Sequence, residues 1–304
     1  MQSRGGDNAA RVTATPEMPA SIRLEDGEYG RRAVITHAWS AEFTELLIAN
    51  NVTELELNDG KGWRGHDLSF LKDLSDLRSL KIIDLKIQTV SPIHFLHELR
   101  QLTVMTYCKT EIRFSEFPHL ESCTLEWRPK AGSLFDCKTL KELFINRYSG
   151  KEFVPFARLI KLEWLALFGA SIRDLRGIGA LTRLRYLRLG LLRQLTSLAG
   201  IEGCAELETL QLDTCRKLRS IDPVRHLSRL RNLHFGNCGE IESLAPLDRL
   251  QNLEWVTFPE STNILDGDLV PLLRQKHLRR VAFQNRRHYS HRRETFQQYW
   301  KESA

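Results

Sequence analysis

The chain has 304 residues, 42% of them hydrophobic, and a formal net charge of +6. The hydrophobic content is that of a folded protein, no apolar run is long enough to span a bilayer, and residues 1–20 lack the apolar segment of a secretory signal. These features predict a cytoplasmic protein, with other export routes left open, and so modest a charge is weak evidence for nucleic-acid binding.

The region before the first repeat divides into two parts by composition. Residues 1–28 are rich in Gly, Ala, Ser, Thr and Pro, and this composition predicts a flexible tail. Residues 29–51 are expected to form an N-terminal cap, with a short strand near 32–36 and a helix that has Ser40 as its N-cap. Apolar residues at helical spacing would then cover the open end of the structure that follows.

From Val52 onward the chain carries a repeated pattern, L-x-x-L-x-L, in which other apolar residues replace some leucines. Residues 162–167 and 184–189 are two consecutive examples. The pattern recurs every 20 to 25 residues, and such a period is typical of solenoids that grow by stacking short repeats. The first positions of repeats one to eleven are Val52, Leu77, Leu99, Leu120, Leu140, Leu162, Leu184, Leu207, Leu230, Leu253 and Leu278.

This spacing resembles the leucine-rich repeat family over residues 52–285. Several returns resemble the short internalin-like subclass, because an apolar residue is followed by Pro or Gly and then another apolar residue, as in 221–224 and 244–247. The resemblance implies one α/β solenoid of about eleven parallel rungs, right-handed and curved, with its strands on the concave side. It also implies a module that binds a protein partner.

The returns of the middle repeats are too short for long helices, so turns and 3₁₀ helices are expected there. A longer helix is expected at 267–275, with Pro271 near its first turn. Residues 286–304 are predicted to form a helical C-terminal cap that starts at Ser290. The residues expected to share one face of this cap are Phe296, Tyr299 and Trp300.

One position departs from the family pattern. Leucine-rich repeats usually have Asn three residues after the last strand leucine, so irregular turns are expected in repeats two to seven, which lack it. Repeats eight and nine have Cys215 and Cys238, which are common substitutes. Equivalent places in adjacent strands are about 5 Å apart, so these cysteines are expected to be buried, reduced thiols, although a disulfide also fits that distance. In repeats two to nine the residues at this position are Leu85, Tyr107, Arg128, Tyr148, Ala170, Leu192, Cys215 and Cys238.

Side chains alternate between the two faces of a strand, so the third, fifth and seventh positions of each repeat are expected on the concave face. Repeats five to seven gather four aromatic residues at these positions, with one Arg beside them and another at the rim. Exposed aromatic patches mark binding sites, and aromatic residues and Arg are enriched among interface hot spots. The predicted partner-binding residues are Phe144, Arg147, Trp164, Phe168, Tyr186, Arg188, Asn232, His234 and Trp255.

The sequence therefore predicts a non-catalytic module of receptor, adaptor or inhibitor type, which recognises a protein on its concave face. Coverage by the chain itself or by a second copy are alternatives for the aromatic patch, although a monomer is expected. An acidic N-terminal end favours a partner that is basic at that end and apolar in the middle; the acidic residues are Glu54, Glu56, Asp59 and Glu126. No common catalytic or nucleotide-binding motif is present, so neither an enzyme nor a cofactor is expected.

The C-terminal end offers an alternative function. Residues 274–293 contain eight Arg and Lys residues and no acidic residue, a composition that suits binding to nucleic acid or another acidic surface. His288 and His291 are three residues apart and can share a helix face, with Glu294 three residues further on, but Ser290 as the helix cap would leave His288 outside the helix and no third ligand is clearly placed. No metal site is therefore predicted.

Overall fold

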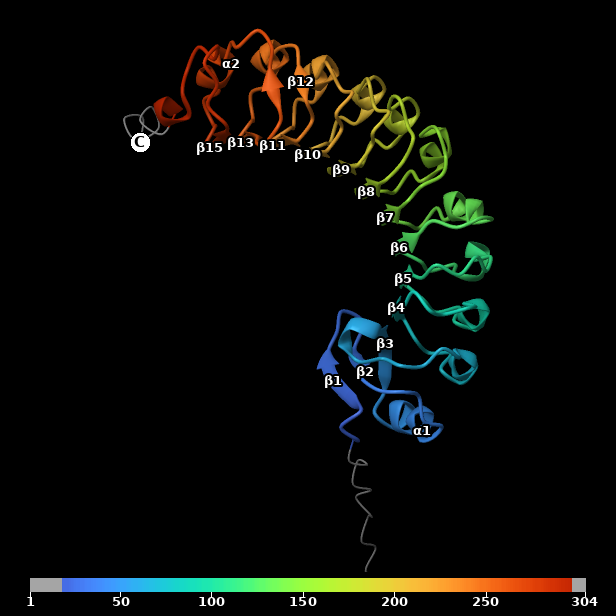
Figure 1. The fold of residues 1–304 in the computed structure, drawn as a ribbon. Coiled ribbons are helices and arrows are strands. Elements are labelled where there is room, and N and C mark those ends of the chain that lie inside the picture. Colours follow the sequence, from blue (N-terminus) through green and yellow to red (C-terminus); the bar gives the residue numbers. More distant parts are fainter. Residues whose placement is uncertain (1–17, 297–304) are drawn as a thin grey trace, which may run out of the picture.

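The computed structural model describes residues 18–296. In this part of the chain thirteen strands form one continuous sheet, which curves into an open arc with the strands along its inner side and the returns along its outer side (Figure 1). From β3 (Val52–Asn58) onward, each strand pairs in parallel with the strand of the next repeat. The predicted curved leucine-rich repeat solenoid is confirmed.

The strands of this sheet are arranged in sequence order, so each repeat contacts only its neighbours. They are β1 (Ile22–Asp26), β2 (Arg31–Ile35), β3, β4 (Ser79–Ile83), β5 (Gln101–Met105), β6 (Ser122–Glu126), β7 (Glu142–Asn146), β8 (Trp164–Phe168), β9 (Tyr186–Gly190), β10 (Thr209–Asp213), β11 (Asn232–Gly236), β13 (Trp255–Phe258) and β15 (Arg280–Phe283). A small second sheet and two α-helices lie outside this main sheet, namely β12 (Glu240–Ile241), β14 (Asn263–Ile264), α1 (Glu42–Ala49) and α2 (Val270–Leu273).

The leucine pattern explains both the strands and their stacking. In repeat seven, Leu187 and Leu189 are fully buried, whereas Arg188 between them is half-exposed on the concave face. The register of β8 and β9 sets Leu165 beside Leu187, and Leu167 beside Leu189. Burial of each leucine side chain contributes about 1.5–3 kcal/mol. The leucine ladders therefore hold adjacent repeats together in one register.

The expected 3₁₀ helices occupy the returns, and several have proline as their second residue. Pro223 and Pro246 lie in the first turn of their 3₁₀ helices, where the missing N–H group has no intrahelical acceptor to lose. The helix predicted at 267–275 is the shorter α2, with Pro271 in its first turn. The 3₁₀ helices are Asp59–Lys61, Ser69–Asp73, Ser91–Phe95, Phe114–Glu116, Gly132–Asp136, Val154–Arg158, Ile178–Ala180, Ile201–Gly203, Asp222–His226 and Ala245–Arg249.

The N-terminal region differs from the prediction. Residues 22–26, which composition assigns to a tail, form β1, because Ile22 is buried in the core and β1 pairs antiparallel with β2. Since β2 pairs in parallel with β3, this hairpin extends the sheet beyond repeat one. Ser40 is not the N-cap of α1, because the chain is already helical at Ala41, and no side chain caps the helix. The buried residues of α1 are Phe43 and Leu47.

At the C-terminal end, Phe296 is buried in the same core as the repeats. The Oγ of Ser290 accepts a hydrogen bond from the backbone N–H of Leu269 at 2.9 Å, which ties the segment after repeat eleven to the last return. The remaining predicted cap residues, Tyr299 and Trp300, lie outside the described residues, as do residues 1–17 of the predicted tail.

Two kinds of turn follow the strands. In repeats five to ten, the residue at the eighth position has a positive φ: Gly169 supplies it in repeat six, whereas Arg147 and Leu191 both adopt φ 58°. The equivalent residues of the earlier repeats, such as Asp84 and Thr106, are not in this left-handed conformation. The predicted irregularity is thus found in repeats two to four. The prediction of irregular turns was wrong for repeats five to seven, because their turns have the same conformation as those of repeats eight to ten.

The turn also decides which residue points inward. Leu85 and Tyr107, which stand at the family's asparagine position, are 54% and 53% exposed, and the preceding residues Asp84 and Thr106 are buried instead. Asp84 remains satisfied because its carboxylate accepts a hydrogen bond from the backbone N–H of Lys86 at 2.8 Å. The turns of these two repeats are therefore irregular, as expected, because they place a polar residue inside one position earlier.

In repeats eight and nine the residue at this position is a buried cysteine, as expected. Cys215 and Cys238 are buried free thiols. The Sγ of Cys215 donates toward the carbonyl of Leu189 at 3.8 Å, and the Sγ of Cys238 donates toward the carbonyl of Leu212 at 3.5 Å. These thiols bond to the backbone near the turn, as the family asparagine would. The other residues buried at this position are Arg128, Tyr148, Ala170 and Leu192.

Candidate functional site

The concave face of repeats five to seven carries the four aromatic residues that the sequence predicts, Phe144, Trp164, Phe168 and Tyr186, called here the aromatic cluster. All four are half-buried, because strand alternation points them away from the leucine core. The rings of Trp164 and Tyr186 stack with centroids 5.2 Å apart and an interplanar angle of 7°. Those of Phe144 and Phe168 lie 5.6 Å apart and are tilted by 30°. The structure therefore brings the predicted cluster together.

Small residues make room for this cluster. A Cβ on Gly190 would lie only 2.3 Å from Cε1 of Phe168, so the phenylalanine ring rests directly on the glycine backbone. Ala166, which pairs in register with Phe144 on one side and Arg188 on the other, is buried although it points to the concave face. Sequence reasoning placed both small residues on this face but missed their role. Their position between larger outward side chains was the available signal.

Arg188 and Tyr186 connect the cluster to the next repeat. The guanidinium of Arg188 lies 5.1 Å from the centroid of the Phe168 ring, and its Nε donates to Oδ2 of Asp213 at 2.9 Å. The Tyr186 hydroxyl donates to Oε1 of Gln211 at 3.0 Å. Burial raises the pKa of Tyr186, which keeps its phenol a neutral donor. These bonds fix the side chains before any partner arrives.

Arg147 does not join the aromatic cluster. It occupies the left-handed turn after β7, and its guanidinium lies 5.2 Å from the ring centroid of Tyr107 and 3.5 Å from the carboxylate of Glu126. Its side chain therefore reaches toward repeats three and four. The structure places this predicted residue at the edge of the face, away from the four aromatic rings.

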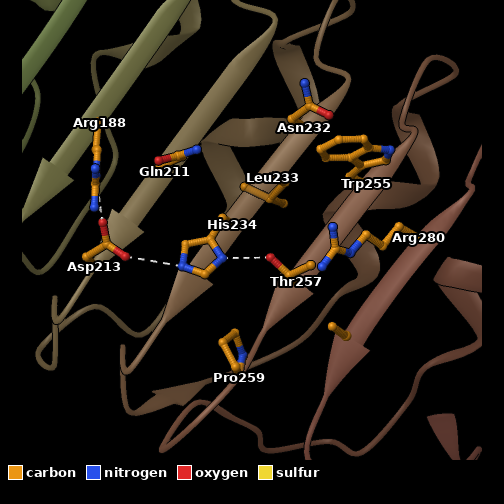
Figure 2. Close-up of a pocket in the computed structure, with 11 residues that line it drawn as sticks. Arg188, Gln211, Asp213, Asn232, Leu233, His234, Trp255, Thr257, Pro259 and Arg280 are labelled. Carbon is orange, nitrogen blue, oxygen red and sulfur yellow. Dashed lines mark hydrogen bonds and ion pairs between the residues drawn. The ribbon is translucent and has the colours of Figure 1, made fainter.

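A pocket of about 410 Å³ lies beside the cluster, on repeats seven to eleven (Figure 2). It contains the predicted residues Arg188, Asn232, His234 and Trp255. Sequence reasoning missed the other side chains, because they are spread over repeats eight to eleven and form no motif in any one repeat. The additional lining residues are Gln211, Asp213, Leu233, Thr257, Pro259, Arg280 and Ala282.

His234 is held on both sides within this pocket. Its Nε2 lies 3.2 Å from Oδ1 of Asp213, and its Nδ1 lies 2.6 Å from the Thr257 hydroxyl (Figure 2). In the neutral ring we assign the proton to Nε2, since Asp213 only accepts, and the threonine hydroxyl then donates to Nδ1. Gly236 leaves room for the ring, because a Cβ there would lie 2.8 Å from Nε2. Both ring nitrogens of His234 are therefore already engaged in hydrogen bonds within the chain.

Trp255 and Arg280 form the C-terminal wall of the pocket. Trp255 is 48% exposed, and the guanidinium of Arg280 lies 5.8 Å from its ring centroid. Within residues 18–296, Arg280 forms no ion pair and the Trp255 indole N–H forms no hydrogen bond. Both groups are thus available to a molecule that enters the pocket.

The acidic side chains at the N-terminal end of the face are satisfied within the chain. Glu54 is buried, and its carboxylate lies 2.7 Å from Nη2 of Arg32. Glu56 is 3.0 Å from Nζ of Lys61; although burial opposes this, hydrogen bonds from Asn58 and Lys61 hold its pKa below the usual range of a glutamate. The expectation of a partner that is basic at this end therefore loses its basis, because these charges are already paired.

Part of the basic C-terminal run is also structural. Arg274 forms an ion pair with Asp248 at 2.7 Å, and Nη2 of Arg286 donates to the carbonyl of Thr262 at 3.1 Å. His288 uses Nε2 to contact the carbonyl of Ile264 at 2.9 Å. A search of residues 18–296 finds no group of His, Cys, Asp and Glu side chains able to hold a metal ion. In the same residues, no helix combines the length and apolar character needed to cross a bilayer.

No family model matches the sequence, and a search of curated proteins also gives no match. Solved structures share the fold. An internalin (inlF) from Listeria monocytogenes aligns with a TM-score of 0.58 at 18% identity, covering 84% of this chain and 87% of that one. The functional domain of InlJ from Listeria monocytogenes aligns with a TM-score of 0.54 at 17% identity, covering 79% of this chain but 55% of that one. At these identities the likeness shows the leucine-rich repeat fold alone.

Proposed function

We propose that the chain is a non-catalytic recognition module, which binds a protein partner on the concave face of repeats five to eleven. The observation that carries this proposal is the aromatic cluster. Four rings stand on a face where the core does not need them, they are ordered by their own contacts, and they remain half-exposed. Exposed aromatic patches on soluble proteins mark interaction sites.

The scaffold suits this role because it is formed before binding. Stacked leucine ladders fix the strands, and side-chain bonds such as that of Tyr186 to Gln211 fix the outward groups. A partner therefore orders few groups on docking, which lowers the entropic cost of association. Aromatic rings beside an arginine are also the side chains from which interface hot spots are most often built.

The proposal is tested by cross-linked affinity purification from the source cells at moderate salt. The intact chain is compared with the triple variant Phe144→Ser, Trp164→Ala, Tyr186→Ala. A matched control variant, Lys81→Ala with Thr103→Ala, changes outward residues of β4 and β5 on the same face. Circular dichroism establishes that all three proteins fold alike.

Recovery of one protein by the intact chain and the control, and its loss with the triple variant, is the expected result. Equal recovery by all three proteins would remove the aromatic cluster as the site. A second contrary result is recovery of nucleic acid that falls steeply as salt rises, because counterion release governs phosphate binding. That outcome would transfer the function to the basic C-terminal run.

A further inference from the structure

We propose that the pocket on repeats seven to eleven takes the carboxylate of an Asp or Glu side chain, which belongs to an extended segment of the partner. An apolar residue of the same segment would sit on the aromatic cluster. This inference rests on the proposed function and adds the chemistry of the partner to it. The segment passes along the concave face, which continues without interruption from β7 to β15 (Figure 1).

The charges of the pocket favour an acid. Two guanidinium groups line it, from Arg188 and Arg280, but its one carboxylate is that of Asp213. Asp213 is already bound by Arg188 at 2.9 Å and by His234 at 3.2 Å. The Arg280 guanidinium therefore has no ion-pair partner among residues 18–296. A carboxylate of a bound partner would provide one.

Neighbouring groups shape this subsite for one acidic side chain. The Arg280 guanidinium lies over the Trp255 ring at 5.8 Å from its centroid, and within residues 18–296 the indole N–H of Trp255 forms no hydrogen bond, so it is a second free donor of the same pocket (Figure 2). The side chain of Asn232, on the adjacent strand, donates to the hydroxyl of Thr209 at 3.1 Å and is held in place. Nucleic acid fits less well, because it needs a row of phosphate contacts, whereas Asp213 adds a negative charge to the lining.

The register gives the spacing that such a segment needs. Tyr186, Thr209, Asn232, Trp255 and Arg280 occupy the same position in successive strands. The four steps from β9 to β15, at about 4.8 Å each, separate the aromatic cluster from Arg280 by about 19 Å. An extended chain advances about 3.3 Å per residue. The acidic residue is therefore expected about six residues from the apolar anchor.

The test begins with a random twelve-residue linear peptide library, displayed on phage and selected on the immobilised full-length chain. A synthetic copy of the most enriched peptide is then titrated against the intact protein, Arg280→Gln and Arg279→Gln. The last variant is a matched control, since it removes an equal charge from the neighbouring residue, which does not line the pocket. The peptide is also tested with its acid changed to the corresponding amide.

The enriched peptides should pair an aromatic or large apolar residue with an Asp or Glu about six residues away. Arg280→Gln should weaken the synthetic peptide about ten-fold or more, as expected for loss of a hydrogen bond between charged groups. Arg279→Gln should change affinity less than two-fold. The amide peptide should bind the intact protein and Arg280→Gln equally weakly. Either change removes the same interaction, that of the peptide carboxylate with the Arg280 guanidinium.

Contrary outcomes separate the two proposals. Peptides that share an aromatic anchor but show no acid would overturn the carboxylate subsite and leave the proposed function standing. Equal losses from Arg280→Gln and Arg279→Gln would also overturn it, because they indicate general attraction to positive charge. Tight binding of a random 20-nucleotide single-stranded DNA that Arg280→Gln abolishes would replace the acidic segment by nucleic acid. Selection of no peptide at all would count against both proposals.

Discussion

Repeats one to four and repeats five to eleven build the same parallel strands, yet they use their concave side chains differently. In the first group, polar side chains bind one another: Glu54 pairs with Arg32, and the hydroxyl of Ser79 donates to Oε1 of Gln101 at 2.7 Å. In the second group, the side chains of the aromatic cluster, Trp255 and Arg280 remain accessible to solvent. A shared fold therefore does not make the whole face a binding surface. The two groups of repeats differ in which outward side chains already have a bonding partner within the chain.

The two groups also differ in their turns, and this difference has a cost. In repeats five to ten, left-handed residues such as Leu191 and Arg147 keep the turns uniform. A non-glycine residue in this conformation costs about 1–2 kcal/mol. Repeats two and three avoid that cost but bury Asp84 and Thr106 instead. Substitutions in each group therefore test whether the two groups differ in this way.

The largest effect is expected at the N-terminal end. Glu54→Ala should lower the free energy of unfolding by about 3 kcal/mol, because it leaves the Arg32 guanidinium and the backbone N–H of Tyr29 without their acceptor. Affinity for a peptide bound at the aromatic cluster should stay within two-fold. Urea titration followed by circular dichroism measures the stability.

The control for this prediction is Glu98→Ala, since Glu98 is exposed and forms no ion pair with another described residue. It should change stability by less than about 0.5 kcal/mol. A similarly small loss for Glu54→Ala would contradict the view that the N-terminal acids serve the fold.

Gly190→Ala should have the next largest effect, and this effect concerns binding. The new methyl group would collide with Phe168 and turn its ring away from Phe144, so affinity for the same peptide should fall about ten-fold. Stability should change by less than about 1 kcal/mol, because a flexible side chain is displaced rather than the backbone. Isothermal titration calorimetry gives the affinity. Gly132→Ala is the control, since open space surrounds that glycine, and unchanged binding by both variants would show that Phe168 is not part of the site.

The smallest effects test the turns. Leu191→Gly should raise the free energy of unfolding by about 0.5–1 kcal/mol, because glycine adopts a positive φ without strain. Leu85→Gly should lower it by a similar amount, since Leu85 does not have a positive φ and glycine adds entropy to the unfolded chain. Both leucines are exposed, so their burial does not decide the sign. Equal signs in thermal unfolding would mean that the two turns do not differ in strain.

The sequence predicted the parts of the fold that depend on spacing. Leu162-x-x-Leu165-x-Leu167 places an apolar side chain on one face of a strand and repeats it, so strands, core and concave face all follow. The hairpin of β1 was missed because its short alternation, Ile22 and Leu24, stands in a segment with a tail-like composition. The turns were partly missed because only Gly169 signals a positive φ, whereas Leu191 does not.

The candidate site was predicted to the same extent. Outward aromatic residues stand out from the repeat, so the aromatic cluster follows from position alone. The chain of bonds from Asp213 through His234 to Thr257 joins residues of three repeats, and each residue is ordinary in its own repeat. Arg280 was counted in the basic run, because only the structure separates it from neighbours such as Arg274 that pair within the chain.

A protein partner is expected to dock on the later repeats of the concave face and not on the earlier ones. A photoreactive amino acid placed at Thr209 of β10, at Thr103 of β5, or at Arg173 outside the sheet tests this most directly. After illumination in source cells, a specific protein adduct is expected from position 209 alone. An adduct of equal yield from position 103, or an adduct from position 173 alone, would show that the partner does not dock specifically on the later repeats of the concave face.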